Sequence, residues 1–374
     1  MKLLLFLLLS ISCAATELNF KLQLLHRDNN EGSAIADYNK DGHLDISAGE
    51  FWYAGPDFKS KKQLRKLGKF GKDYMTNNGE HSYDVDGDGW VDIIAGSFKE
   101  TELFWYKNPG KDGLEKGELW EKKLIAKTTN QNEITYIHDF NGDGKPEYIA
   151  NSWNARVPQK IWFFTFNQST PTIKAHQIGK FNGHGIGFGD VNNDGHEDIL
   201  ISQGWYERPK TEPFTKEWTF HKDWNIKQAS CPMIVTDLNK DGLNDFIVGL
   251  GHNYGLYWME KLKDGKWKKH EIDKSISQLH AIAYVDIDND GEKEIITGKR
   301  VRAHSGKDPG ANDKPMIVYY KLDQKTMTFK RHLIMDDIGT GLFIRAVDLT
   351  KNGYKDLVLA GKGGTHIVYN LGKK

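Results

Sequence analysis

The nine residues Asp190-Val-Asn-Asn-Asp-Gly-His-Glu-Asp198 contain an order of side chains that recurs along the chain. Oxygen-bearing side chains stand at positions 1, 3, 5 and 9, and a glycine stands at position 6. Copies of this pattern, which we call the Asp-rich loops, also begin at Asp37, Asp84, Asp139, Asp237, Asp286 and Asp348. The copies begin roughly 50 residues apart, a period that indicates a solenoid or a propeller.

The Asp-rich loops have the composition of a calcium-binding turn. Calcium takes six to eight oxygen ligands in irregular geometry, and a glycine permits the sharp turn that wraps the ion. The alternative is a turn closed by Asp and Asn side chains without metal. The carboxylate density of the first six copies favours calcium, whereas Thr350 and Asn352 replace two carboxylates in the seventh, which should bind weakly or not at all. The predicted ligands of about six structural calcium ions are Asp37, Asn39, Asp41, Asp45, Asp84, Asp86, Asp88, Asp92, Asp139, Asn141, Asp143, Glu147, Asp190, Asn192, Asp194, Asp198, Asp237, Asn239, Asp241, Asp245, Asp286, Asp288, Asp290 and Glu294.

Each Asp-rich loop lies within a fixed order of apolar segments. A small-residue stretch such as Gly185-Ile-Gly-Phe-Gly189 precedes the loop, and an apolar segment such as Ile199-Leu-Ile-Ser202 follows it. An aromatic segment such as Phe104-Trp-Tyr106 and an alternating one such as Trp120–Ile125 come next. This order predicts a four-stranded antiparallel blade, and seven units predict an all-β, seven-bladed β-propeller. The N-terminal segment Phe20–His26 should complete the last blade and close the ring.

The composition indicates a globular protein with a balanced surface charge. Of the 374 residues, 27% are charged and 38% are hydrophobic, and 51 basic side chains match 51 acidic ones. No basic surplus indicates nucleic acid, so nucleic-acid binding is not expected. We expect residues 16–374 to form a single propeller domain.

The first 15 residues have the features of a signal peptide. Lys2 precedes the apolar run Leu3–Leu9, and small residues surround Cys13. The run is too short to span a bilayer, so we expect no transmembrane span. Cleavage after Ala15 predicts a secreted or periplasmic protein, whereas lipidation of Cys13 predicts an anchor at the cell surface. In both cases Cys231 is the only possible free thiol of the mature chain, so interactions other than disulfides have to stabilise it.

The loops and the apolar segments that follow them resemble the FG-GAP and VCBS repeat families. The resemblance extends over essentially the whole mature chain and implies a calcium-bound β-propeller. It does not specify the function, because such propellers serve adhesion receptors, lectin-like modules and enzymes alike.

A second set of residues should lie on the face opposite the Asp-rich loops. In a propeller blade the turn between the first two strands lies on one face, and the connections between blades lie on the other. Six residues before each loop, at the predicted start of each inner strand, stand Glu31, Asn78, Glu133, His184, Cys231, His280 and Leu342. Imidazole and carboxylate groups bind zinc or another first-row divalent ion and also transfer protons. The alternative is a polar lining of a water-filled channel.

The connections after each second strand should reach the same face and supply ligand-binding residues. The predicted substrate-binding residues are Trp153, Arg156, Gln203, Trp205, His252 and Lys299. The tryptophans suit stacking on sugar rings, with packing between blades as the alternative. The connection at 300–313 is extended and rich in Arg and His, which favours a functional loop. Lys362 lies in the last of these connections.

Two pairs of segments are similar to the propeller of aldos-2-ulose dehydratases and their bacterial relatives. These are 183–190 with 203–207, and 279–283 with 297–310. Those enzymes dehydrate keto-sugars at a metal-assisted site, so the resemblance implies roles for His184, His280, Lys299, Arg300 and His304. We predict that His184, His280 and Glu133 bind the metal or act as the base, and that Arg300 and His304 assist the substrate or leaving group.

The sequence leaves two functions open. The first is an exported, calcium-stabilised carbon–oxygen lyase or dehydratase that acts on keto-sugars with a divalent metal. The second is a non-catalytic propeller that binds glycans or proteins at the cell surface. Either protein would bind a small sugar or glycan, and the sequence does not specify its oligomeric state.

Overall fold

The computed structural model describes residues 17–97, 99–128, 131–132, 134–152, 156–165 and 172–373. The predicted signal peptide with Cys13, and the candidate residues Glu133 and Trp153, lie outside these ranges. Within them, every helix is too short or too polar to cross a membrane.

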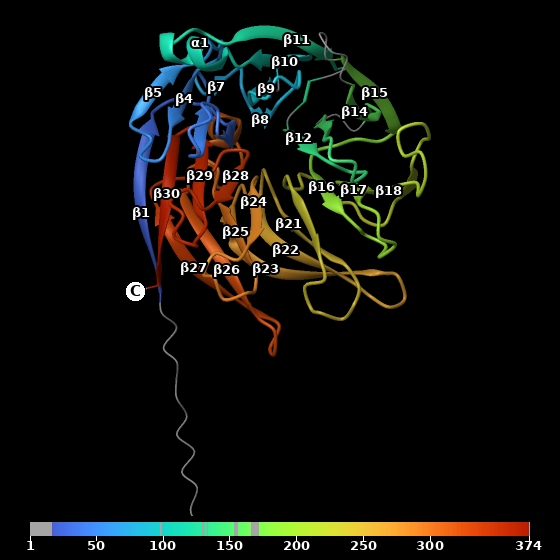
Figure 1. The fold of residues 1–374 in the computed structure, drawn as a ribbon. Coiled ribbons are helices and arrows are strands. Elements are labelled where there is room, and N and C mark those ends of the chain that lie inside the picture. Colours follow the sequence, from blue (N-terminus) through green and yellow to red (C-terminus); the bar gives the residue numbers. More distant parts are fainter. Residues whose placement is uncertain are drawn as a thin grey trace, which may run out of the picture.

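Five four-stranded antiparallel sheets are the main units of the fold (Figure 1). In each sheet a short inner strand is followed by strands that lie progressively further from the centre of the ring. Their strands, from inner to outer, are β2 (Ser33–Ala36), β3 (Asp45–Ala48), β4 (Phe51–Ala54) and β5 (Ser60–Gln63); β8 (Gly79–Tyr83), β9 (Asp92–Gly96), β10 (Glu102–Lys107) and β11 (Glu121–Lys127); β12 (Ile134–His138), β13 (Glu147–Asn151), β14 (Gln159–Thr165) and β15 (Thr172–Gly179); β24 (Ile282–Val285), β25 (Glu294–Gly298), β26 (Met316–Asp323) and β27 (Thr328–Asp336); and β28 (Ile344–Val347), β29 (Asp356–Gly361), β30 (Gly364–Lys373) and β1 (Leu18–His26).

The strands of the two remaining repeats form one eight-stranded sheet, because their inner strands pair with each other in parallel. In this pairing Gly187 is opposite Met233. A Cβ atom on Gly187 would lie 2.4 Å from the Met233 carbonyl oxygen, so glycine is what allows the two backbones to approach. The strands, in spatial order, are β19 (Thr219–His221), β18 (Gly204–Glu207), β17 (Asp198–Ile201), β16 (Ile186–Gly189), β20 (Met233–Thr236), β21 (Asp245–Gly249), β22 (Tyr254–Lys261) and β23 (Trp267–Ser277).

The prediction of a seven-bladed propeller is therefore wrong. The described residues form an all-β propeller arrangement with five separate four-stranded blades, and the eight-stranded sheet takes the place of two further blades. The sequence showed where strands repeat. The parallel pairing depends on how closely the backbones of β16 and β20 approach, and the repeat pattern does not predict that distance.

Smaller elements occupy the connections. The hairpin of β6 (Lys69–Phe70) and β7 (Tyr74–Met75) lies between the first two sheets in the sequence. Among the described residues, the one α-helix is α1 (Gly110–Lys116), which ends at Gly117 in the left-handed conformation. A 3₁₀ turn, η1, spans Ala303–Gly306.

The two ends of the described chain meet in one sheet, as the sequence predicted. β1 pairs antiparallel with β30, with Phe20 opposite Asn370 and Leu24 opposite His366. In Figure 1 the two strands lie side by side, one coloured blue and the other red. The pairing leaves β1 rather than β30 as the outer strand of the sheet, and it closes the ring of sheets.

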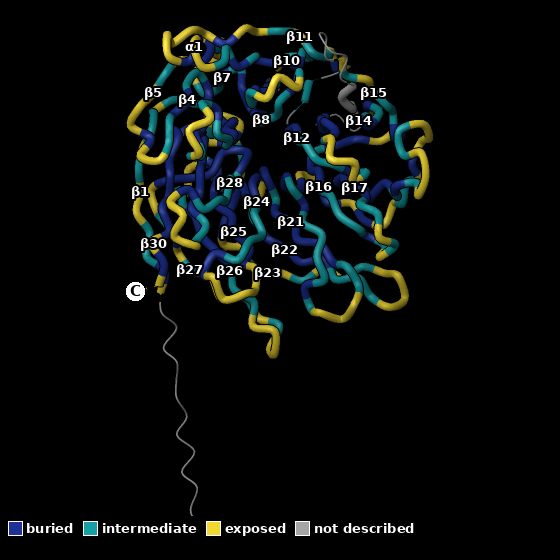
Figure 2. Tube along the Cα trace, viewed as in Figure 1, coloured by how far each residue is buried: buried dark blue, intermediate teal, exposed yellow. Residues whose placement is uncertain are grey.

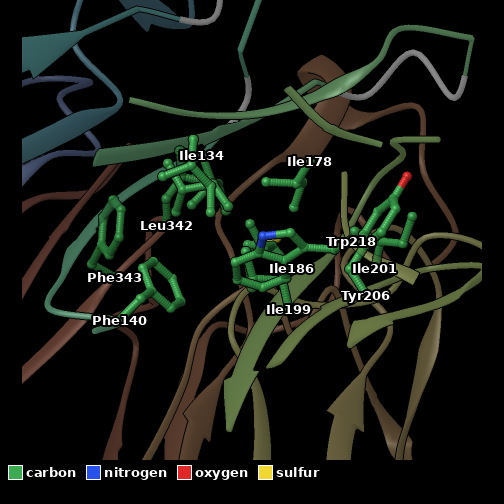
Figure 3. Close-up of a cluster of buried hydrophobic side chains, with 13 residues drawn as sticks. Ile134, Phe140, Ile178, Ile186, Ile199, Ile201, Tyr206, Trp218, Leu342 and Phe343 are labelled. Carbon is green, nitrogen blue, oxygen red and sulfur yellow. The ribbon is translucent and has the colours of Figure 1, made fainter. Parts of the chain in front are cut away.

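Most of the core lies between neighbouring sheets, and one further cluster lies within the eight-stranded sheet, between its two halves. One cluster combines Ile134 of β12 with Ile186 of β16 and Ile199 of β17, and Leu342 before β28 packs against it (Figure 3). The second strand of each repeat is almost wholly buried, whereas most of the innermost strands are buried at their starts and half-buried beyond. Exposed segments concentrate in turns and at the periphery (Figure 2). This packing fixes the ends of the inner strands, which carry the candidate site.

Candidate functional site

Three histidines from three connections meet at the starts of the inner strands. His184 precedes β16, His252 lies in the β21–β22 turn, and His280 precedes β24. Their ring centroids are 4.7 Å (His184 to His252), 5.0 Å (His184 to His280) and 5.3 Å (His252 to His280) apart. We call this group the histidine cluster. The sequence predicted that His184 and His280 share one face, and the structure brings them together with His252.

The histidine cluster has the donor atoms that a first-row divalent cation requires. One ring nitrogen from each histidine lies within 4.8 Å of the others, and the Nε2 atoms of His184 and His252 are 2.9 Å apart. His280 is fully buried and His252 is nearly so. Neutral imidazoles in a shielded position are characteristic ligands of zinc and related metals. These three residues would hold such an ion.

Asp308 orients two of the histidines that face this region. Its carboxylate accepts hydrogen bonds from Nδ1 of His252 at 2.7 Å and from Nδ1 of His304 at 2.8 Å, and the two rings stack with centroids 4.1 Å apart. Burial alone would raise the pKa of Asp308, but the bonds from His252 and His304 hold it below its usual value. With Nδ1 of His252 as the donor, Nε2 carries the lone pair that faces His184. The sequence pattern does not single out Asp308, although it predicts a functional role for the extended connection that contains this residue.

A cavity of about 690 Å³ opens beside the histidine cluster. His184, His252 and His304 line one side, and the hairpin residues Phe70 and Tyr74 also line it. The remaining lining residues are Asn78, Lys99, Gln131, Gln228, Arg300, Ser305, Lys307 and Leu342. Three positions six residues before an Asp-rich loop, Asn78, His184 and Leu342, therefore border one cavity. Its size is that of a small-molecule site.

The cationic residues of the extended connection have structural partners. Both carboxylate oxygens of Glu31 accept hydrogen bonds from Arg300, at 2.8 and 2.7 Å. Lys299 is buried, and its ammonium donates to the carbonyl oxygens of Arg300 at 3.1 Å and Ala311 at 3.2 Å. Lys299 thus holds the connection in place, so the prediction that it binds substrate does not fit its position. Glu31, which the sequence placed at the start of an inner strand, fixes Arg300 at the cavity wall.

The connection itself has an unusual backbone where it reaches the cavity. Arg302, His304 and Ser305 adopt φ values of 48°, 46° and 57°, which are uncommon for residues other than glycine. Arg302 is held by an ion pair of 2.8 Å to Asp73 in the β6–β7 turn. Such strain tends to persist at functional sites, where the surrounding contacts enforce it. Here it places the ring of His304 against His252.

Three other predicted ligand-binding residues lie elsewhere. Trp205 is buried in a cluster between the two halves of the eight-stranded sheet, stacks on His221 at 4.2 Å and donates its indole N–H to Asp223 at 2.9 Å. These contacts are those of a packing residue, so the predicted contact of Trp205 with a ligand does not fit. Gln203 is half-buried in the β17–β18 turn, and Arg156 is exposed, and neither lines the cavity.

The Asp-rich loops lie at the other ends of the inner strands, away from the histidine cluster. In the loop at Asp190, the first carboxylate accepts hydrogen bonds from the backbone N–H groups of Asp194 at 2.9 Å and Gly195 at 2.8 Å. The ninth residue, Asp198, begins β17 and accepts from the N–H groups of Val191 and Arg208, both at 2.9 Å. The ninth residue thereby ties the loop to the end of the third strand.

Loop shape alone does not distinguish a calcium site from a plain turn. In the seventh loop Asp348 accepts the equivalent bonds from the N–H groups of Asn352 at 3.0 Å and Gly353 at 2.8 Å, although two carboxylates are missing there. The carboxylate content is what differs. Only the donor atoms of the other six loops therefore indicate calcium.

The donor atoms of the first six loops suit a hard cation. Burial raises the pKa of the ninth residue to about 6 or 7 in each of them, namely Asp45, Asp92, Glu147, Asp198, Asp245 and Glu294. Buried carboxylate oxygens of Asp84, Asp86, Asp288 and Glu294 have no hydrogen-bond partner among the described residues. A cation would offset the desolvation and repulsion of these groups. The predicted ligands thus fit calcium.

Two of the six loops also contain a lysine ammonium. Lys107 contacts Asp86 and Asp88, and Lys321 contacts Asp288 and Asp290. Both lysines lie on the third strand of their sheets, β10 and β26. An ammonium and a calcium ion would compete for the same carboxylates, so competition should be strongest at these two loops. In the loop at Asp190 the lysine is more distant, with Lys210 Nζ 4.0 Å from Asp194.

Comparisons with known proteins identify the repeats. The model of the FG-GAP-like repeat matches residues 84–150, 139–201 and 237–297. A comparison with curated proteins finds no match. Among solved structures, the chain is similar to the exotype rhamnogalacturonan lyase YesX, with a TM-score of 0.53 and 12% identity over 94% of this chain and 72% of that one. At this low identity the similarity shows the fold alone. Together with the repeat match, it confirms a propeller that contains FG-GAP-like repeats.

Proposed function

We propose that this chain, which contains FG-GAP-like repeats, is a carbohydrate-active lyase or dehydratase that acts on keto-sugars with a divalent metal at the histidine cluster. The observation that carries the proposal is the convergence of His184, His252 and His280 beside a cavity of sugar size. The signal-peptide features of residues 1–15 support export of the protein. The six carboxylate-rich loops support a structural role for calcium.

The lining of the cavity suits a polar, ring-shaped ligand. Phe70 and Tyr74 offer aromatic surface on which the apolar face of a sugar can stack. Arg300, Lys99 and Lys307 offer donors for hydroxyl and ketone oxygens. The hairpin with the aromatic residues and the connection with His304 lie on different elements joined by the Arg302–Asp73 ion pair. The ligand would therefore lie between the hairpin and the histidine cluster.

The residues of the site divide into binding and proton-transfer roles. A divalent ion, when bound, would withdraw electron density from a sugar ketone and make the neighbouring C–H more acidic. His304 lines the cavity and donates Nδ1–H to Asp308, which leaves the Nε2 lone pair to accept that proton. Arg300, held by Glu31, places a fixed positive charge near the departing hydroxyl. His304 is thus the proposed base and Arg300 the group that assists the leaving oxygen.

Turnover and metal content together test the proposal. The purified protein is incubated with anhydrofructose and with 3-keto-glycosides, while enone absorbance is recorded and zinc and calcium are measured separately by elemental analysis. We expect enone formation by the wild type, loss of bound zinc in H280A, and retained zinc with at least 100-fold slower turnover in H304A. Sugar binding without turnover of any keto-sugar, together with no transition metal in the wild type, would show a non-catalytic glycan-binding propeller instead.

A further inference from the structure

A second cavity of about 450 Å³ lies next to the first, on the same face of the molecule. It is lined by the end of β1, the β6–β7 hairpin and the turn between β29 and β30. Tyr74 lines both cavities, so the two share a wall. Asn29 donates to the carbonyl oxygen of Lys72 at 2.8 Å, which joins the end of β1 to the hairpin. Glu50 of the β3–β4 turn completes the lining, so four elements build the second cavity.

The most unusual residue of this cavity is Lys362. Its side chain is only 6% exposed, yet it forms no ion pair within the described part of the chain. Its ammonium donates one hydrogen bond, to the carbonyl oxygen of Arg302 at 3.0 Å, and lies 3.8 Å from the centroid of the Tyr74 ring. Glu31 and Asp73, whose negative charges act on Lys362, are engaged by Arg300 and Arg302. A buried ammonium with three donors and no anion of its own is costly unless a ligand supplies one.

The surroundings of Lys362 add positive charge. Arg27, Lys69 and Lys72 are exposed at the same cavity, so four basic side chains line it against the two carboxylates of Asp28 and Glu50. One of these carboxylates is already engaged, because Glu50 accepts the N–H of Leu67 at 2.8 Å. Burial raises the pKa of Asp28 to about 6, so this carboxylate is still mostly ionised at pH 7, but the four cations outnumber the two carboxylates. The cavity therefore favours an anion.

We infer that the second cavity binds the carboxylate of an acidic sugar, with Lys362 as the buried partner of the carboxylate and Arg27, Lys69 and Lys72 at the rim. An ammonium that gains a charged acceptor forms a charge-assisted hydrogen bond, which is stronger than its present bond to a carbonyl. That the carboxylate belongs to a sugar rests on the proposed function, because Tyr74 would contact ligands in both cavities. The anion site itself does not depend on the histidine cluster.

Matched sugars test this inference by isothermal titration calorimetry. Methyl β-D-glucuronide carries a carboxylate, and methyl β-D-glucoside is its neutral counterpart. We expect the wild type to bind the glucuronide at least 10-fold more tightly. K362M should abolish this preference and K362R should keep part of it, whereas K263M, a change at an exposed lysine in the β22–β23 turn, should leave it intact. Melting curves verify that the variants fold. If K362M does not fold, the reduced preference of K362R tests the site.

Other outcomes separate this inference from the proposed function. H184A should keep the preference for the glucuronide even if it loses metal and activity, because His184 lines only the first of the two cavities. Equal affinity for the two glycosides, or a preference unchanged in K362M, would overturn the site. Acetate that binds as tightly as the glucuronide would also overturn it, because the cavity would then recognise a free carboxylate and not an acidic sugar.

Discussion

Replacing Asp308 with Asn should weaken metal binding at the histidine cluster without touching any proposed ligand. The carboxylate accepts the Nδ1–H groups of both His252 and His304, at 2.7 and 2.8 Å. An amide of the same shape offers one acceptor oxygen, and its NH₂ group would face the second donor. If His252 loses its acceptor, its ring can move its proton to Nε2, the atom that faces His184. That proton would then have to leave before a metal could bind.

The size of the expected loss of zinc affinity follows from the burial of His252. An unsatisfied donor in a side chain that is 2% exposed costs about 1–3 kcal/mol, which corresponds to roughly 5- to 150-fold in affinity. Loss of a carboxylate behind a metal-binding histidine commonly costs about 10- to 100-fold. We therefore expect D308N to bind zinc roughly 10- to 100-fold more weakly than the wild type in competition with a chromophoric chelator.

A matched control lies in the same connection. Asp313 is exposed and accepts a bond from the Tyr254 hydroxyl at 2.6 Å, and no bond joins it to the histidine cluster. D313N makes the same chemical change and should leave zinc affinity within about twofold of the wild type. Equal zinc affinities for D308N, D313N and the wild type would refute the assignment of Asp308 as the residue that orients His252.

Three further predictions concern stability. Chelating calcium should lower the melting temperature, because each site with a dissociation constant near 10⁻⁴ to 10⁻³ M contributes on the order of 0.4 to 1.4 kcal/mol at about 1 mM calcium. Adding calcium should raise the melting temperature of K107M more than that of the wild type, because no ammonium competes at Asp86 and Asp88. Equal increases in melting temperature in a thermal shift assay would contradict this. W205F loses the hydrogen bond to Asp223, so its free energy of unfolding should fall by about 1 kcal/mol while its affinity for sugar stays the same. A change in sugar affinity would show that Trp205 does contact the ligand. Burial lowers the pKa of Lys362 from 10.5 to about 8, so K362M should be more stable than the wild type by about 1–3 kcal/mol in urea at pH 7. Between pH 8 and 10.5 the unfolded wild type binds the proton that the folded protein has lost, so the wild type gains stability and the difference should shrink, whereas a constant difference would contradict the burial of a charged ammonium.

The sequence predicted the repeating parts of the fold well, because they depend on local pattern. The glycine and carboxylate spacing of the Asp-rich loops located the turns between the first and second strands, and the alternation of Phe20–His26 identified the strand that pairs with β30. The number of separate blades was wrong, because the parallel pairing of Gly187 with Met233 depends on a backbone approach that no periodicity encodes. Local pattern therefore predicts elements more securely than it predicts how adjacent sheets join.

The site was predicted in part for a similar reason. Counting back from the loops located His184 and His280, because the start of an inner strand has a fixed offset within the repeat. Asp308 was missed because it lies in an irregular connection whose path is set by tertiary contacts such as Arg302 with Asp73. The burial of Lys362 was missed because this residue lies in the short turn between β29 and β30 and is covered by a distant element, the hairpin that carries Tyr74. Trp205 was misplaced because an aromatic residue near a strand end packs between sheets as readily as it faces a ligand.

The two kinds of site lie at opposite ends of the same short inner strands, and this arrangement separates stability from chemistry. β16 has only four residues between the histidine cluster and the Asp-rich loop at Asp190. Its backbone is held on both sides, by β17 and by β20, so a loop that loses its cation can loosen without moving His184 as long as the strand stays paired. We therefore expect calcium removal below the melting temperature to leave zinc affinity at the histidine cluster nearly unchanged. Zinc affinity that falls in parallel with calcium occupancy at 25 °C would instead show that the inner strands transmit the state of the loops to the site.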